Sequence, residues 1–158
     1  MKKLILLAFI FSLSATTYVS AQTKQSQKEV FAPIYQNSKS IVKSESFLYV
    51  GNMVLEDRTR EKLSDDSNQL VISDSKMSGE LVSIKSKNKT INVSGDISDY
   101  NVNFNDDKQE ISISFSVKSA SETVSVNIEV KPNGNAFLTA SSGNDTLIYW
   151  TGKIKNKD

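Results

Sequence analysis

The sequence predicts a mainly β domain in which an N-terminal helix packs on an antiparallel meander of about eight or nine strands. Two observations carry this prediction. From residue 100 onward, apolar residues alternate with polar ones over long stretches, as in half-buried antiparallel strands. Strand starts recur about every 8–12 residues with short polar turns between them, which is typical of all-β proteins. A curved sheet, a sandwich and a lipocalin-like barrel all satisfy this pattern.

The chain begins with the pattern of an export signal. Lys2 and Lys3 precede an apolar run over residues 4–13, and a small-residue cleavage site ends at Ala21. The apolar run is too short to span a bilayer, which takes about 20 residues. We therefore expect cleavage between Ala21 and Gln22, export to the periplasm or the exterior, and a soluble protein with no transmembrane segment after cleavage.

A helix is predicted to follow the signal. Residues 22–28 are polar and without a pattern, which predicts a flexible leader before a single domain over residues 29–158. Apolar side chains up to Val42 then follow the spacing of an amphipathic helix. Because proline breaks helix interiors, Pro33 predicts that the helix covers the later part of this stretch and ends at Ser44.

Nine stretches beyond the helix are predicted as strands. The alternation is clearest over residues 111–117, where Ile113 and Phe115 share one face and Ser114 lies on the other. Asn133-Gly134 favours a type I′ hairpin turn, since both residues accept a positive φ. The predicted strands are 47–54, 69–73, 77–84, 90–93, 100–104, 111–117, 124–130, 136–141 and 146–153.

Composition excludes several classes of function. The 158 residues include no Cys and no His, which excludes disulfides, thiolate or triad catalysis, and Cys- or His-ligated metals. The lack of Cys also excludes a lipid anchor of the lipoprotein type. A net charge of +1 removes the electrostatic case for a nucleic-acid binder. We expect neither a cofactor nor a metal centre.

Ser–Lys pairs and acidic pairs remain as catalytic candidates. The Ser-x-x-Lys spacings are about as frequent as chance predicts, and residues three apart on a strand point to opposite faces. The acidic pairs lie in polar, turn-like surroundings that are typical of hydrated carboxylates. The spacings are Ser40/Lys43, Ser73/Lys76 and Ser86/Lys89, and the acidic pairs are Glu56/Asp57, Asp65/Asp66 and Asp106/Asp107.

Two further features suggest binding surfaces. Lys85, Lys87 and Lys89 alternate, so on a strand they would form one basic row. That row suits an anionic glycan, a lipid headgroup or a partner, although such charges also protect edge strands from edge-to-edge pairing. The neighbours Tyr149 and Trp150 predict one ring in the core and one outward, with Trp150 inside because it aligns with other apolar residues.

Strand patterns punctuated by glycine recur in segments 47–84, 99–104, 111–130, 133–136 and 148–154. In these segments the chain resembles a family of exported domains of Bacteroidetes-type bacteria, domain of unknown function 4251. The likeness covers roughly residues 44–154 and implies the family's fold and location, but it brings no known activity. Residues 77–81 depart from the family, whose members carry a Leu-Pro-Tyr-Phe-Gly-like stretch there.

These features predict an exported, non-catalytic binding or interaction domain of the bacterial cell envelope, with an envelope protein or a glycan as its partner. The first alternative is a barrel carrier of a small apolar ligand, which would leave an apolar void among the inward side chains. The second is a His-free hydrolase built on paired carboxylates.

Asp145-Thr146-Leu147 resembles the O-glycosylation triplet of Bacteroidetes-type bacteria, which makes Thr146 a candidate modification site.

Overall fold

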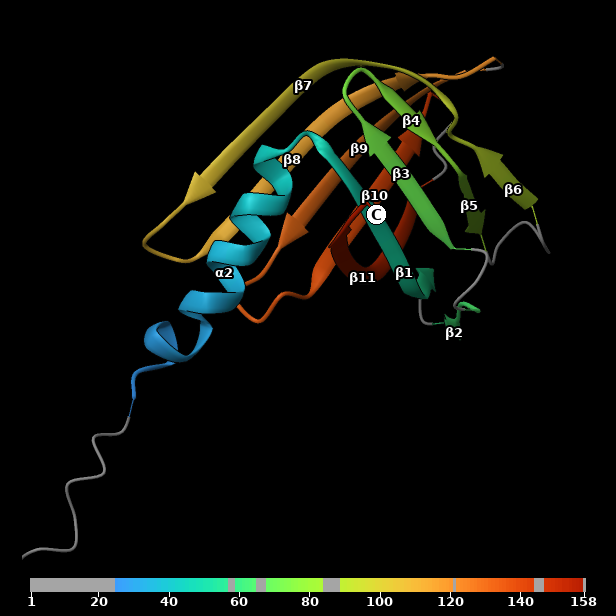
Figure 1. Cartoon of the computed structure of the whole chain (residues 1–158). Coiled ribbons are helices and arrows are strands. Elements are labelled where there is room, and N and C mark those ends of the chain that lie inside the picture. The colour runs from blue at the N-terminus through green and yellow to red at the C-terminus, as the bar shows by residue number, and fades with distance from the viewer. Residues whose placement is uncertain are drawn as a thin grey trace, which may run out of the picture.

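The computed structural model of the chain (Figure 1) describes residues 25–56, 59–64, 68–83, 89–120, 122–143 and 147–157. Within these residues the chain forms one helix and eleven strands, which confirms the mainly β, antiparallel architecture predicted from the sequence. The elements are α2 (Gln27–Lys43), β1 (Ser46–Glu56), β2 (Thr59–Lys62), β3 (Gln69–Ser73), β4 (Lys76–Ser78), β5 (Glu80–Ser83), β6 (Lys89–Asn92), β7 (Gly95–Asn105), β8 (Glu110–Lys118), β9 (Thr123–Val130), β10 (Ala136–Ser142) and β11 (Leu147–Asn156).

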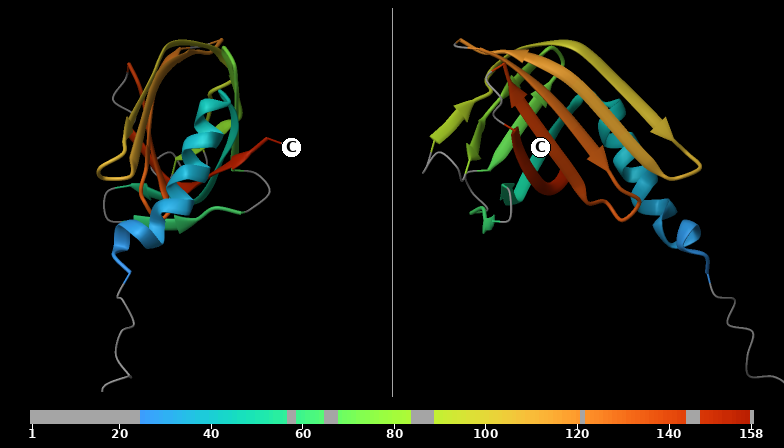
Figure 2. Two further views of the ribbon diagram at one scale, coloured as in Figure 1. Left: turned by 60° about the vertical axis from the view of Figure 1, so that its left-hand side comes forward. Right: turned by 180° about the vertical axis from the view of Figure 1, so that it is seen from behind.

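Eight of the described strands close into a barrel (Figure 2). In the order β1-β3-β4-β7-β8-β9-β10-β11 each strand pairs with the next, and β11 returns to pair antiparallel with β1. The short strand β2 pairs with the far end of β1, and β5 and β6 form a separate hairpin. The closed ring fits the lipocalin-like barrel among the predicted alternatives.

The helix α2 begins earlier than the sequence predicts. The Ser26 hydroxyl accepts a hydrogen bond from the Glu29 backbone N–H, and the Glu29 carboxylate accepts one from the Ser26 N–H, which completes a capping box. The helix therefore starts at Gln27, inside the segment 22–28 that was expected to be a flexible leader. Pro33 lies within the helix, so the expectation that it confines the helix to later residues is wrong. The capping box stabilises the turn before Pro33, and the proline itself is exposed to solvent.

Gly79 divides the predicted strand 77–84 into β4 and β5. Its φ of 140° suits glycine alone, and a Cβ there would lie 2.7 Å from the Gln69 carbonyl oxygen. The Gly79 carbonyl accepts from the Val93 N–H, and its N–H donates to the Ser94 hydroxyl, each at 3.1 Å. At this point the chain leaves the barrel wall and forms the β5–β6 hairpin.

The β9–β10 turn is not the predicted type I′ turn. Gly134 has a positive φ of 79°, whereas Asn133 does not. The Gly134 N–H donates to the Lys131 carbonyl at 2.9 Å, as in a type I turn followed by a left-handed glycine. Pro132 favours this turn because its ring fixes the φ that the second residue of a type I turn requires.

Large apolar side chains fill the barrel. Tyr49 is fully buried, and its hydroxyl donates to the main-chain carbonyl oxygens of Ala136 on β10 and Trp150 on β11, each at 3.1 Å. These side chains form one hydrophobic core cluster inside the barrel. The largest fully buried side chains are Trp150, Tyr49, Phe47, Leu70, Ile72, Met77, Leu81, Ile111, Ile113, Ile128, Leu138 and Ile148.

Both ends of the barrel are covered. The helix α2 lies across one end (Figure 2, left) and buries Tyr35, Ile41 and Val42. The β5–β6 hairpin lies at the other end (Figure 1), where the Trp150 indole N–H donates to the Val82 carbonyl at 3.1 Å. The outward faces of the described strands are surfaces that other molecules can contact.

Candidate functional site

The strands β8 to β11 form the back of the barrel (Figure 2, right), and their registers align a row of uncharged outward side chains across them. Neighbouring strands lie about 4.8 Å apart, so the row sets hydroxyl, amide and aromatic groups at regular intervals across the strands. Antiparallel pairing aligns, one strand after the next from β8 to β1, Ser114, Asn127, Thr139, Tyr149 and Leu55.

Two adjoining hollows follow this row and share Thr139. The first, of about 350 Å³, lies over β8, β9 and β10 and has mostly polar side chains around it. The second, of about 420 Å³, lies over β10, β11 and the end of β1 and is more apolar. We name the two together the outer trough, defined by the outward side chains of Asp99, Ser114, Asn127, Thr139, Phe137, Tyr149 and Leu55.

Asp99 stands at the polar end of the outer trough, on a β-bulge. The β7–β8 register shifts between Ser98 and Asn101, and Asp99 adopts a φ of 56°. Left-handed backbone is uncommon for residues other than glycine, and bulges often re-aim side chains beside functional sites. Here the bulge sets Asp99 at the rim of the first hollow, while Tyr100 packs against Phe115 with ring centroids 5.9 Å apart.

Two exposed rings form the other end of the outer trough. Phe137 is 42% exposed and Tyr149 is 46% exposed. In the β10–β11 register Phe137 lies opposite Thr151 and Tyr149 opposite Thr139, so the two aromatic residues are diagonal neighbours, about 7–8 Å apart. Beside them the Thr151 hydroxyl and the Asn52 side-chain oxygen are hydrogen-bonded at 2.6 Å. The apolar area of the outer trough is thus concentrated at this end.

The strands that carry the outer trough are fixed by their opposite face. Buried and exposed positions alternate along β8 and β9, so that Ile113, Phe115, Val126 and Ile128 pack inside while their neighbours face outward. Because these strands are paired on both sides, a ligand would meet a surface that is already in place. Such a surface loses little conformational entropy on binding.

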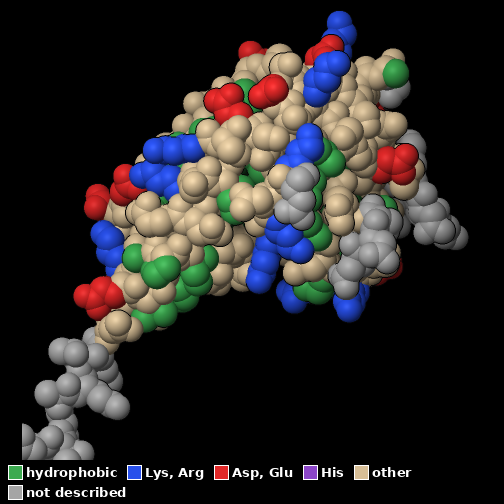
Figure 3. Space-filling model, viewed as in Figure 1, with side chains coloured by type: hydrophobic (Ala, Val, Ile, Leu, Met, Phe, Trp, Pro, Cys, Tyr) green, Lys and Arg blue, Asp and Glu red, His purple; other side chains and the backbone are tan. Residues whose placement is uncertain are grey.

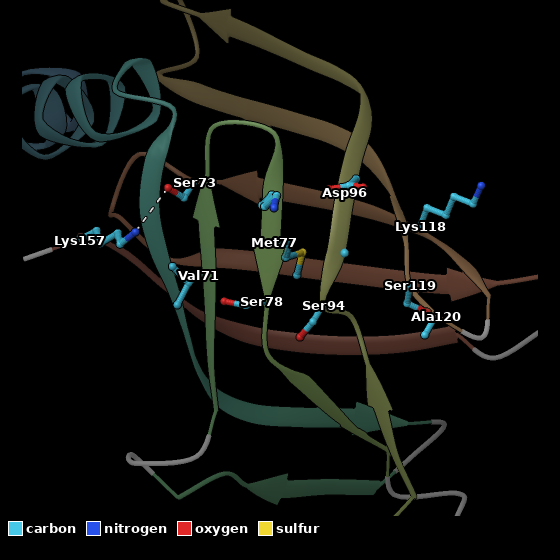
Figure 4. Close-up of a pocket in the computed structure, with 12 residues that line it drawn as sticks. Val71, Ser73, Met77, Ser78, Ser94, Asp96, Lys118, Ser119, Ala120 and Lys157 are labelled. Atoms are coloured by element: carbon cyan, nitrogen blue, oxygen red, sulfur yellow. Dashed lines mark hydrogen bonds between the residues drawn. The ribbon is translucent and has the colours of Figure 1, made fainter.

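The opposite outer face of the barrel differs in charge. Lys and Arg side chains gather near the C-terminal end of the chain and over β1 and β3 (Figure 3). A hollow of about 720 Å³ lies on this side, where β4 and β7 pair at two positions. In Figure 4 Lys157 points towards Ser73, whose hydroxyl lies 3.4 Å from the Lys157 amine, and Lys118 points away from the hollow.

A turn brings Ser73 and Lys76 together. Asp74 and Ser75 connect β3 to β4, so Ser73 and Lys76 are directly opposite each other on a hairpin. The expectation that these two residues face opposite sides is therefore wrong. Lys76 is exposed to solvent, however, whereas lysines that activate a nucleophile are desolvated.

The described members of two acidic pairs make structural contacts. Glu56 is 4% exposed and accepts a hydrogen bond from the Ser83 hydroxyl at 2.6 Å, so the expectation of a hydrated carboxylate is wrong there. Asp106 accepts from the Lys39 ammonium at 2.5 Å and from the Tyr35 hydroxyl at 2.6 Å, which ties α2 to the β7–β8 turn. These hydrogen bonds, that of Lys39 first, hold the pKa of Asp106 below its usual range. Burial, followed by the contact with Asp106, raises the pKa of Tyr35 to about 12.

Within the part of the chain that the structure describes, no three acidic side chains are grouped so as to hold a metal ion. The described helix is not long and apolar enough to cross a membrane.

The division of the two adjacent rings follows the prediction, since Trp150 is 1% exposed while Tyr149 faces outward. Lys89 is the first residue of β6. Several other residues that the sequence singled out lie outside the described residues: Ala21, Gln22, Asp57, Asp65, Asp66, Lys85, Ser86, Lys87 and Thr146.

The sequence did not identify Asn127, Thr139 and Phe137 as parts of one surface. Each is an outward member of an alternating strand, which is visible in the sequence. Their alignment with Ser114 and Tyr149 follows from the registers of β8 to β11, which no single strand pattern contains.

Comparison with known proteins identifies the fold and the family. A crystal structure of a DUF4251 family protein from Bacteroides eggerthii DSM 20697 matches with a TM-score of 0.70 over 82% of this chain and 91% of that chain. The two sequences are 14% identical, so this likeness concerns the fold. No curated protein matches the sequence. Residues 31–154 match the profile of the family described as domain of unknown function (DUF4251), and the chain therefore belongs to that family.

Proposed function

We propose that the chain is an exported, non-catalytic binding domain of the bacterial cell envelope, with the outer trough as its ligand-binding surface. The pattern of residues 1–21 supports export. The lack of Cys supports a bacterial envelope location, because small secreted eukaryotic domains usually depend on disulfides.

One observation carries the binding role. The row from Ser114 to Leu55 is uncharged across five strands and turns from polar to apolar along its length, with Tyr149 and Leu55 at the apolar end. A surface that serves only solubility carries interspersed charges, whereas here charged neighbours such as Glu129, opposite Phe137, lie beside the row and not in it. Exposed rings beside hydroxyl and amide groups are instead typical of a surface that contacts another molecule.

The two alternatives have less support. A carrier needs an apolar void, whereas Phe47, Tyr49 and Trp150 fill inward positions of the barrel. A hydrolase needs two carboxyl groups across a cleft, whereas Glu56 and Asp106 make structural hydrogen bonds.

Retention on cell-envelope material tests the binding role. We expect the purified chain to co-sediment with envelope preparations from Bacteroidetes cells, and the trough variant, Asn127→Ala with Tyr149→Ala, to lose most of this retention. The matched variant on the opposite face, Ser78→Ala with Lys157→Ala, should be retained like the unaltered chain. If the trough variant is retained equally well, the outer trough is not the binding surface.

Export requires its own test. The full-length chain, expressed with its own first residues in a Bacteroidetes host, should be recovered from the periplasm or the medium with Gln22 at its N-terminus. An intact chain that still carries Met1 and stays in the cytoplasm would contradict export.

A further inference from the structure

The hydrogen-bonding groups of the outer trough are unused within the domain. In the described part of the chain, the side chains of Ser114, Asn127 and Thr139 make no hydrogen bond to another protein group. Hydroxyl and amide side chains both donate and accept. The row therefore offers a ligand mixed donors and acceptors about 4.8 Å apart, one per strand.

The aromatic end offers a second kind of contact. Tyr149 and Phe137 present exposed rings on the same face as the polar row, and Leu55 extends the apolar area beyond Tyr149. Aromatic faces carry partial negative charge and attract the weakly positive C–H groups of a ring packed against them. A ligand that fits both ends must have apolar ring faces and many hydroxyl groups.

Charge narrows the class of ligand further. Asp99 is the one charged residue among the described residues that line the two hollows. A carboxylate accepts hydrogen bonds from hydroxyl groups but repels phosphates, sulfates and uronates. Arg60 lies opposite Leu55, beyond the apolar end, and no cationic side chain is among the described residues that line either hollow.

A protein partner fits this surface less well. Stable protein interfaces bury about 800 Å² on each partner around a well-packed and largely apolar centre. In the outer trough the apolar groups lie at one end and the centre is a row of Ser, Asn and Thr. The arrangement is long, narrow and polar in its middle.

We propose that the outer trough binds a neutral glycan chain that lies across the strands, with a sugar ring on Tyr149 and Phe137 and its hydroxyl groups on Thr139, Asn127 and Ser114. Asp99 accepts a hydrogen bond from a hydroxyl at the far end of the chain. This inference rests on the binding role proposed above and gives its ligand class. The role of the bulge at Asp99 is then to place a carboxylate at the rim of the first hollow, where it can accept this hydrogen bond.

Isothermal titration of the exported chain with soluble oligosaccharides tests this proposal. The probes are neutral oligosaccharides of glucose, xylose, mannose or N-acetylglucosamine, neutral oligosaccharides released from the surface glycans of Bacteroidetes cells, and oligogalacturonate as the anionic counterpart. We expect binding of at least one neutral probe and none of oligogalacturonate. Tyr149→Ala should weaken binding about tenfold, whereas Tyr149→Phe, which keeps the ring, should stay within about twofold. The Ser78→Ala, Lys157→Ala variant should bind like the unaltered chain.

The outcomes separate the ligand class from the binding role. Preference for oligogalacturonate, or affinity unchanged by Tyr149→Ala in a variant that melts like the unaltered chain, overturns the glycan proposal. Failure of every neutral probe also overturns it. If envelope retention still depends on Asn127 and Tyr149 in that case, the binding role stands and the partner is a protein. If retention is also independent of both residues, the binding role fails with the glycan proposal.

Discussion

The strands β8 to β11 present two faces of opposite character. Their inward face is formed by side chains such as Phe115, Ile128 and Leu138, which are at most 3% exposed. On their outward face Ser114, Asn127, Thr139 and Tyr149 form an uncharged row, and charged side chains such as Lys118, Glu129 and Lys153 lie nearer the ends of the strands. The alternation of the sequence thus divides one set of strands into a face that holds the barrel together and a face that is free to bind. Substitutions on the two faces should therefore have different effects.

The largest difference is expected between two adjacent residues of β8. Phe115→Ala removes a buried ring and should lower the free energy of unfolding by about 2–5 kcal/mol, because the surrounding core cannot close the cavity. Ser114→Ala, on the outward face, should change it by at most about 0.5 kcal/mol. Urea unfolding curves of both variants provide the measurement. If Ser114→Ala were the more damaging change, the assignment of the two faces would be reversed.

The contact between β11 and β1 provides a second comparison. A Cβ on Gly152 would lie 2.2 Å from the Val50 carbonyl oxygen, so Gly152→Ala forces the two strands apart where the barrel closes. We expect a loss of about 1–3 kcal/mol. Gly143, whose Cβ would meet nothing within 4 Å, is the matched control, and Gly143→Ala should be neutral or slightly stabilising. Equal melting temperatures for the two variants would show that the close approach at Gly152 does not limit closure.

At the end of the barrel that α2 covers, an intermediate effect on stability is expected. The carboxylate of Asp106 is exposed there, but it also makes structural hydrogen bonds. The pKa of Asp106 is lowered in the folded state by Lys39 and Tyr35, so its contribution to stability is present above the pKa of an unfolded Asp and is lost as the pH falls through the folded pKa. Asp106→Asn should therefore be less stable than the unaltered chain near neutral pH, and the gap should close in acid. Thermal melts across this pH range measure the gap. Asp107→Asn, at a fully exposed neighbour with one long ion-pair contact to Lys28, serves as the control.

The smallest effect is expected in the outer trough. Asn127 is exposed and its side chain makes no hydrogen bond to another described residue, so Asn127→Ala should shift the free energy of unfolding by at most about 0.5 kcal/mol. Chemical denaturation of this variant therefore tests whether the outward row is dispensable for folding. If Asn127→Ala lowered the free energy of unfolding by more than about 1 kcal/mol, Asn127 would have a structural role, and its position would no longer need ligand binding as an explanation.

Local patterns were sufficient to predict most of the fold. Alternation placed Ile113 and Phe115 inside and Ser114 outside, and it located β3 at residues 69–73. The predicted bounds of the helix and of one strand were wrong where a single residue or a cap determines the backbone more strongly than the apolar periodicity does. The capping box at Ser26 extends α2 across Pro33, and the φ of Gly79 divides an apparently continuous strand.

The candidate site could be predicted only in part. The exposed Tyr149 beside the buried Trp150 follows from alternation along one strand. The outer trough, by contrast, depends on which residues of five strands lie side by side, and a shift of one register step would move each side chain to the other face. The bulge that sets Asp99 at its rim has no signature in the sequence that alternation alone would reveal.

The central claim is that ligand binds on the outward face of β8 to β11. Amide chemical-shift mapping of the ¹⁵N-labelled chain during titration with a neutral oligosaccharide that binds in calorimetry tests it most directly. The account predicts that the largest shifts fall on Ser114, Asn127, Thr139 and Tyr149 and their strand neighbours. Shifts concentrated on the β5–β6 hairpin and inward residues such as Leu81 would indicate a ligand entering the barrel, and would contradict it.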